Sequence, residues 1–292
     1  MGTPAGLFGL ATVRQNLATA QEASFHEIFP SEVFALAPVK GFVIWDSHAF
    51  NLTEQDTTLE QWMNLTFVSP NEASYERVQI FDAHDIFGMG RIEAFTSKDA
   101  CTSFTMPQYS RVLTLSSHTH RYGKEFRVWY PPNAPCNNDD PNNQCQRPDR
   151  DSDYVSYDYS DPVYQRFEGD KVLALDSPNA EDRTFTYCAH WENGSTDPSE
   201  VRRESGKPDA DTCKFLDVFA PLASKNGFDF FTCGCAPADR SCFGGPDQGM
   251  LCNGDDSVCG DGGICDACPL GGGVTTEEEM FILLGSYYVK TP

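Results

Sequence analysis

The sequence predicts an all-β protein, an antiparallel β-sandwich or jelly roll with a disulfide-rich insertion. Short runs of aromatic and β-branched residues alternate with polar residues at a period of two, which is typical of strands with one buried face. Stretches rich in Pro, Asn, Asp and Gly separate these runs and indicate turns. The chain of 292 residues also carries 12 cysteines, an even number that favours disulfides.

The predicted strands are spread along the chain. In order they are Phe42–Trp45, Asn64–Val68, Arg111–Leu115, Glu125–Tyr130 and Met280–Leu284. Only Pro4–Ala23 and Thr57–Trp62 have a composition that suits a helical turn or more. We therefore expect an N-terminal β region over residues 1–110 and a C-terminal β-sandwich over residues 111–292.

Two insertions interrupt the predicted C-terminal sandwich. Residues 131–159 are dominated by Asn, Asp, Pro and Tyr, and Cys136 and Cys145 can close a loop within them. Residues 233–268 hold seven cysteines and almost no large apolar residues. Because such a segment cannot build a core of its own, we expect cross-links to hold it together.

Metal binding is an alternative for the second insertion. The spacing of Cys265 and Cys268 suits zinc, but no second well-spaced pair completes four ligands. A weaker calcium hypothesis rests on acidic residues that lack the order of an EF-hand loop, namely Asp255, Asp256, Asp261 and Asp266. Disulfides fit this cysteine pattern better than either metal.

The charge of the chain limits its partners. There are 43 acidic and 21 basic residues, for a formal net charge of −22. A polyanion repels phosphate backbones and anionic lipids, so we expect neither nucleic-acid binding nor membrane attachment. The cysteines favour an oxidising compartment, either secreted or periplasmic. Because Met1 is not followed by a basic leader, we expect the chain to be a fragment of a longer one.

One histidine pair stands out among the six histidines. His118 and His120 are two residues apart at the end of a predicted strand, so both imidazoles can leave the same face and reach one metal. Near the C-terminus, Met280 follows three consecutive acids and opens an apolar strand. We expect His26, His84 and His190 to be ordinary surface or structural histidines.

Taken together, these two segments resemble the copper type II, ascorbate-dependent monooxygenases, the family of peptidylglycine α-hydroxylating and dopamine β-monooxygenases. The first segment is the His118-Thr-His120 strand with the Gly123 turn after it, and the second is Glu278-Glu-Met280, which leads into Tyr287-Tyr288. Gly169-Asp170, followed by Arg183-Thr-Phe-Thr-Tyr-Cys188, is similar to the strands between the two ligand segments of that family. The sequence departs from the family at Phe281, where members often carry a cysteine.

The resemblance implies a function and a set of ligands. An oxygen-binding copper would be held by His118, His120 and Met280, and a reductant such as ascorbate would act as co-substrate with O2. Two imidazoles and a thioether are a donor set that favours Cu(I). Members of the family hydroxylate a C–H bond of peptide glycines or aryl ethylamines, so we expect a small-molecule or peptide substrate.

The resemblance is incomplete at the second copper of the family. His48 lies in a segment similar to the one that bears a ligand of that copper, but the chain contains no adjacent His-His pair. Residues 1–110 would then belong to a truncated first monooxygenase domain. The alternative function is a secreted copper-binding or adhesive β-sandwich that performs no catalytic turnover.

Overall fold

The computed structural model describes most of the chain from residue 90 onward and parts of the region before it. The described residues are 26–36, 55, 58, 60–69, 71, 74–82, 90–207, 234–273 and 277–290. Within these ranges the regular structure consists of strands and of 3-10 helices no longer than four residues. The predicted all-β class is confirmed.

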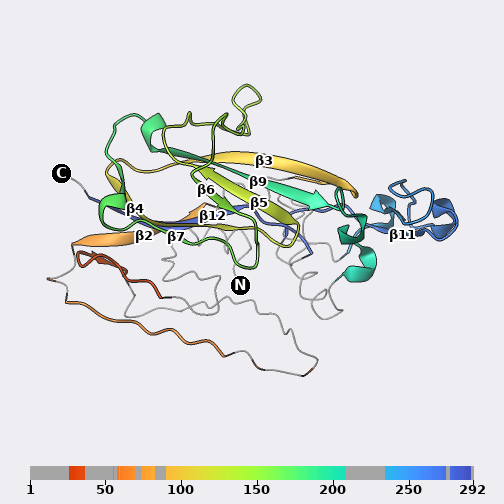
Figure 1. The fold of residues 1–292 in the computed structure, drawn as a ribbon, viewed down its shortest axis with the longest axis horizontal. Helices are drawn as coiled ribbons and strands as arrows, with labels where there is room; N and C mark the ends of the chain where they lie inside the picture. The colour runs from red at the N-terminus through yellow and green to blue at the C-terminus, as the bar shows by residue number, and fades with distance from the viewer. Residues whose placement is uncertain are drawn as a thin grey trace, which may run out of the picture.

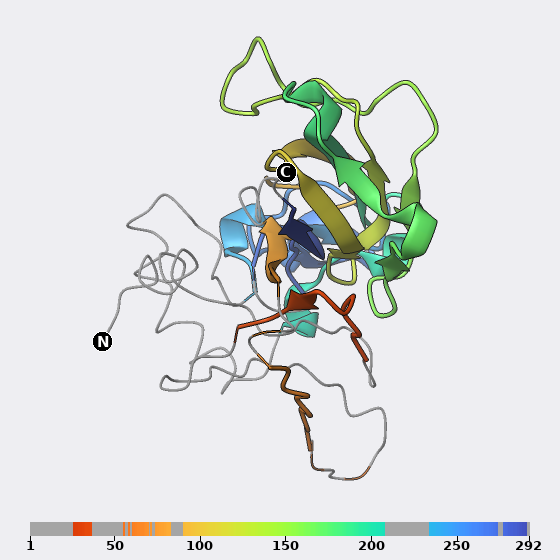
Figure 2. The same cartoon turned by 90° about the vertical axis from the view of Figure 1, so that its left-hand side faces the viewer.

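The strands form two main sheets that lie face to face (Figures 1 and 2). The first sheet has the order β1 (Val33–Phe34), β2 (Tyr75–Asp82), β12 (Ile282–Val289), β4 (Ser110–His118) and β7 (Gln165–Arg166), with β8 (Leu173–Leu175) also paired to β4. The second has the order β3 (Thr96–Thr105), β9 (Thr184–Asn193), β5 (Gly123–Trp129) and β6 (Tyr154–Ser156). Apart from the parallel β1–β2 pair, neighbouring strands in both sheets are antiparallel, as predicted.

The sandwich does not divide at residue 110. β2 and β3 lie before this position, yet β2 pairs with β12 from Arg77 to Asp82, and β3 pairs with β9 over its full length. The expected boundary between residues 1–110 and 111–292 is therefore wrong for the described strands. The physical reason is that β12 is a central strand, which needs a hydrogen-bonded neighbour on each side.

The individual strand predictions have mixed outcomes. Arg111–Leu115 lies within β4, and Glu125–Tyr130 lies within β5 except for its last residue, while β5 begins two residues earlier at Gly123. Met280–Leu284 contributes the start of β12, which begins at Ile282. Asn64–Val68 is not a strand but an extended, exposed segment, and the described part of Thr57–Trp62 is not helical. Phe42–Trp45 and Pro4–Ala23 lie outside the described residues.

The hydrophobic core fills the space between the two sheets. Aromatic side chains dominate it, and Phe281 lies at its centre with only 1% of its surface exposed. The Phe281 ring contacts Phe126, Tyr187 and Trp191 at centroid distances of 5.7, 4.9 and 5.3 Å. Phe281 is thus a central core residue.

Disulfides hold the Cys-rich insertion together, as predicted. Cys235–Cys268, Cys242–Cys259 and Cys252–Cys265 are all bonded. A hairpin of β10 (Ser241–Phe243) and β11 (Ile264–Ala267) gives the segment its only strands in the described part, and the segment projects from one end of the sandwich (Figure 1). Because Cys265 and Cys268 are oxidised, the zinc alternative is wrong.

The remaining cross-links lie in the sandwich and in the first insertion. Cys101–Cys188 joins β3 to β9, and Cys136–Cys145 closes a loop within residues 131–159. This first insertion is not entirely a loop, since Tyr154–Ser156 pairs with β5 as strand β6. Five disulfides in the described part are typical of proteins from oxidising compartments. None of the helices in this part of the chain has the length and apolar character needed to cross a bilayer.

Candidate metal centre

The histidine pair lies where β4 ends. His118 is the last residue of β4 and is paired with Ile282 on β12. Ser117, one residue earlier, points into the sandwich, where its Oγ lies 3.0 Å from the hydroxyl of the core residue Tyr154. Because side chains alternate along a strand, His118 points to the outer face of the first sheet.

A backbone carbonyl fixes the orientation of the His120 ring. His120 is buried, and its Nδ1 lies 2.9 Å from the backbone oxygen of Glu278. A carbonyl can only accept, so Nδ1 carries the proton and the lone pair is on Nε2. Metal-binding histidines almost always donate their other ring N–H in this way, often to a backbone carbonyl.

Met280 belongs to the segment that runs beside the histidine turn. Phe281 points into the core, so its neighbours Met280 and Ile282 point to the outer face of the sheet. The pairing of β12 with β4 ends at Ile282 and His118, and Met280 lies two residues before this pair. Met280 is half-buried, and the hydrogen bond from His120 to Glu278 brings its chain segment beside the histidine turn.

The spacing of the two imidazoles fits a shared metal ion. Their ring centroids are 5.1 Å apart and the rings are nearly perpendicular, at 88°. A ring nitrogen lies about 1.1 Å from its centroid and about 2.0 Å from a bound metal, which places each centroid about 3.1 Å from the ion. Two centroids 5.1 Å apart then subtend about 110° at the ion, close to the tetrahedral angle.

A buried carboxylate, Glu279, lies on the inner side of the same turn. It is fully buried, and its two oxygens accept N–H groups from the backbone of His120, Tyr122 and Gly123 and from the indole of Trp191. Burial raises the pKa of Glu279 to about 8, while these four N–H groups act in the opposite direction and favour the ionised carboxylate, because all four can only donate. The sequence alone does not distinguish Glu279 from its two acidic neighbours, because nothing in their order marks one as buried.

The other two acids of this run have different environments. Glu277 forms an ion pair with Arg121, at 2.7 Å, and accepts a hydrogen bond from the Tyr122 hydroxyl at 3.1 Å. Burial raises the pKa of that hydroxyl, and the Glu277 carboxylate raises it further. The Glu278 side chain is buried against Gly273, where an added Cβ would lie 2.0 Å from Glu278 Oε2.

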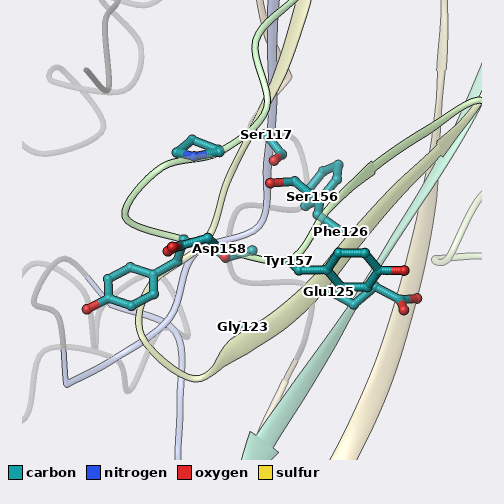
Figure 3. Close-up of a pocket in the computed structure, with 10 residues that line it drawn as sticks. Ser117, Gly123, Glu125, Phe126, Ser156, Tyr157 and Asp158 are labelled. Atoms are coloured by element: carbon teal, nitrogen blue, oxygen red, sulfur yellow. The ribbon is translucent and has the colours of Figure 1, made fainter.

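A small pocket lies on the inner side of the β4 end, away from the outward-pointing histidines. Its ten lining residues include Ser117, Thr119, Glu125, Tyr157 and Asp158 (Figure 3). His118, His120 and Met280 are not among its lining residues.

The remaining histidines do not join this centre in the described part of the chain. His190 lies on β9 and contacts the carboxylates of Asp99 and Glu192 at 3.2 and 3.5 Å, in keeping with a structural role. His26 is an exposed residue whose backbone oxygen accepts a hydrogen bond from Arg166. His48, expected at a second copper, lies outside the described residues, as does His84.

Three of the four acidic residues proposed for calcium have protein partners. Asp255 accepts the Ser257 N–H at 2.9 Å, Asp256 accepts the Cys265 N–H at 2.7 Å, and the Asp266 carboxylate binds Ser205 through two hydrogen bonds. These contacts stabilise turns of the insertion and its attachment to the sandwich, which gives these acids a structural role.

Comparison with known proteins adds no relative. The chain matches no protein-family model and no curated protein. The geometry around His118, His120 and Met280 is therefore the basis for assigning a function.

Proposed function

We propose that this protein is a copper-dependent monooxygenase, which hydroxylates a C–H bond of a small-molecule or peptide substrate with O2 and a reductant such as ascorbate. Copper bound by His118, His120 and Met280 would supply the activation of dioxygen. We also propose that the protein acts outside the cytoplasm, either secreted or in a periplasm, because its five described disulfides need an oxidising compartment.

The orientation of His120 is the observation that carries this proposal. Its Nδ1 donates to the Glu278 carbonyl at 2.9 Å, so Nε2 is the ring nitrogen through which His120 would bind a metal. The His118 ring lies at a spacing that allows a shared ion with a near-tetrahedral angle. The tautomer and the spacing together support a metal-binding role for this pair.

The expected ligands have different chemical roles at this centre. His118 and His120 supply imidazole nitrogens, and Met280 supplies a soft thioether that favours the reduced metal. Phe281 and the core fill the inner side of the sheet, so oxygen and substrate would have to reach the metal from the other side.

A binding protein without turnover is the second candidate. It is favoured by the absence of an adjacent His-His pair from the sequence, since the family uses such a pair at its electron-supplying copper. This candidate shares the ligands His118, His120 and Met280 and differs only in lacking catalysis.

One experiment separates these functions. The purified protein is loaded anaerobically with Cu(I), and oxygen consumption with ascorbate is measured with and without a glycine-extended peptide or an aryl ethylamine. A monooxygenase binds copper and forms hydroxylated product. His120→Ala abolishes both, while His190→Ala, a control at a histidine bound by carboxylates, leaves both unchanged. Copper uptake without product supports the binding protein, and absence of copper uptake refutes both functions.

A further inference from the structure

We propose that Glu279 is the positioning residue of this centre, whose buried carboxylate holds the histidine turn against the methionine segment before any metal binds. This inference rests on the proposed copper function, because the ligands that Glu279 would position are those of the copper. Glu279 itself is not a ligand in this proposal, since its oxygens point toward the inner side of the turn.

Each oxygen of the carboxylate accepts two N–H groups. Glu279 Oε1 lies 2.6 Å from the backbone nitrogen of Tyr122 and 3.1 Å from that of Gly123. Oε2 lies 2.7 Å from the backbone nitrogen of His120 and 3.1 Å from Nε1 of Trp191. The carboxylate thus ties residues 120–123 to β9 through one buried group.

The backbone of Glu279 is held as firmly as its side chain. Its N–H donates to the Gly271 oxygen at 3.0 Å, and its carbonyl accepts from the Gly273 nitrogen at 2.9 Å. Gly271 and Gly273 follow shortly after Cys268, which is disulfide-bonded to Cys235 and whose carbonyl accepts a hydrogen bond from Asn193. These contacts fix the position of the backbone immediately before Met280.

The contacts require a carboxylate and not merely a polar side chain of the same shape. Glutamine at this position would present one oxygen, which can accept two N–H groups, and one NH2 group, which can accept none. In either orientation of the amide, its NH2 group would face two of the four N–H donors of the site, and no bulk water is present to accept from them. Glu279→Gln should therefore release the turn, although it changes only a single atom.

The test measures the turn without metal and the metal affinity separately. In the metal-free protein, amide hydrogen exchange by NMR reports on His120, Tyr122 and Gly123. A competition titration against a chromophoric Cu(I) chelator then gives the dissociation constant at a temperature where every variant is folded. We expect Glu279→Gln to speed exchange of these three amides at least about 100-fold and to weaken Cu(I) binding at least about tenfold.

Three further variants make the result specific. Glu277→Gln changes a neighbouring acid that contacts Arg121 and the Tyr122 hydroxyl, and it should alter Cu(I) affinity less than about threefold. Glu204→Gln removes a carboxylate that accepts the Cys235 N–H at 2.8 Å, so it should lower stability with the same small effect on affinity. If Glu279→Gln does not fold, Glu279→Asp keeps the charge but shortens the reach, and should weaken Cu(I) binding about threefold to tenfold.

The possible results have distinct meanings. Wild-type Cu(I) affinity in a Glu279 variant whose turn amides exchange freely would overturn the positioning role while leaving the copper function intact. Fast exchange of these amides in the wild-type protein would also overturn it. A wild-type protein with protected amides that takes up no Cu(I) would instead refute the proposed function, and with it the assignment of Glu279 to a copper centre.

Discussion

Gly123 closes the turn after the histidine pair, and its replacement by alanine should open that turn. A Cβ at this position would lie 2.5 Å from Thr119 Oγ1, 2.6 Å from Thr119 Cβ and 3.1 Å from Thr119 Cγ2. Non-bonded carbon atoms prefer about 3.5–4.0 Å, so the two backbones must separate by about 1 Å. Thr119 is buried and cannot turn away into solvent.

Three terms set the change in the free energy of unfolding: two destabilise the folded protein and one stabilises it. Overpacking costs about 1–3 kcal/mol. Displacing the Gly123 N–H from the Glu279 carboxylate, 3.1 Å away, costs about a further 1.5–3 kcal/mol. The reduced entropy of the unfolded chain returns about 0.4–1 kcal/mol. We therefore expect Gly123→Ala to lower the free energy of unfolding by about 2–5 kcal/mol, measured by urea denaturation with tryptophan fluorescence.

A second-site test identifies the contact that causes this loss. Thr119→Gly removes all three clashing atoms, whereas Thr119→Ala keeps the Cβ that would lie 2.6 Å from the new methyl group. The cost of Gly123→Ala should fall by at least half in the Thr119→Gly background and stay nearly unchanged in the Thr119→Ala background. Equal rescue by both, or a cost below about 0.5 kcal/mol in the wild-type background, would refute the packing argument.

Three other predictions follow from the same geometry. Met280→Leu keeps the side-chain volume, so the free energy of unfolding should change by less than about 1.5 kcal/mol. The X-ray absorption spectrum of the Cu(I)-loaded variant should lose the sulfur contribution seen in the wild-type protein. Sulfur scattering that persists in the variant would exclude Met280 as a ligand. The Arg127 guanidinium, 2.8 Å from Glu125, lowers the pKa of that carboxyl, so this pair stabilises the fold at neutral pH and loses its effect as the pH falls below about 4. Arg127→Gln should raise the pKa of Glu125 measured by carbon NMR, and an unchanged value would contradict this cause. Replacing both Cys242 and Cys259 with serine should allow proteolysis within the insertion while tryptophan fluorescence of the sandwich stays unchanged; a shift in that fluorescence would show that the two parts unfold together.

The strand periodicity predicted the fold class but not the strand partners. Arg111–Leu115 and Glu125–Tyr130 became β4 and β5, because each has a neighbour on both sides and an aromatic core to cover. Asn64–Val68 has the same alternation, yet it lies exposed without a ladder in the described part of the chain. Alternation shows that a segment can bury one face, but only the complete topology shows whether a sheet edge is open to receive it.

The candidate ligands could be selected from the sequence, whereas the group that supports them could not. His118, His120 and Met280 differ in residue type from everything around them. Glu279 is one of three consecutive acids, and its burial depends on the inward direction of Phe281 and on the amides of a turn about 160 residues earlier. That information lies in the packing of two distant segments, which a local pattern does not contain.

The outward direction of the histidines depends on an irregularity in β4 that strict alternation would have missed. Val112 and Leu115 both lie in the core although they are three residues apart, because the pairing with β12 skips Leu113 between Tyr287 and Ser286. Counting from Val112 at a period of two without this bulge would direct His118 into the core, where a metal-binding imidazole could not be reached by substrate. The extra residue reverses the alternation within a single strand. One end of β4 can thus bury Val112, while the other end presents His118 on the outer face of the sheet.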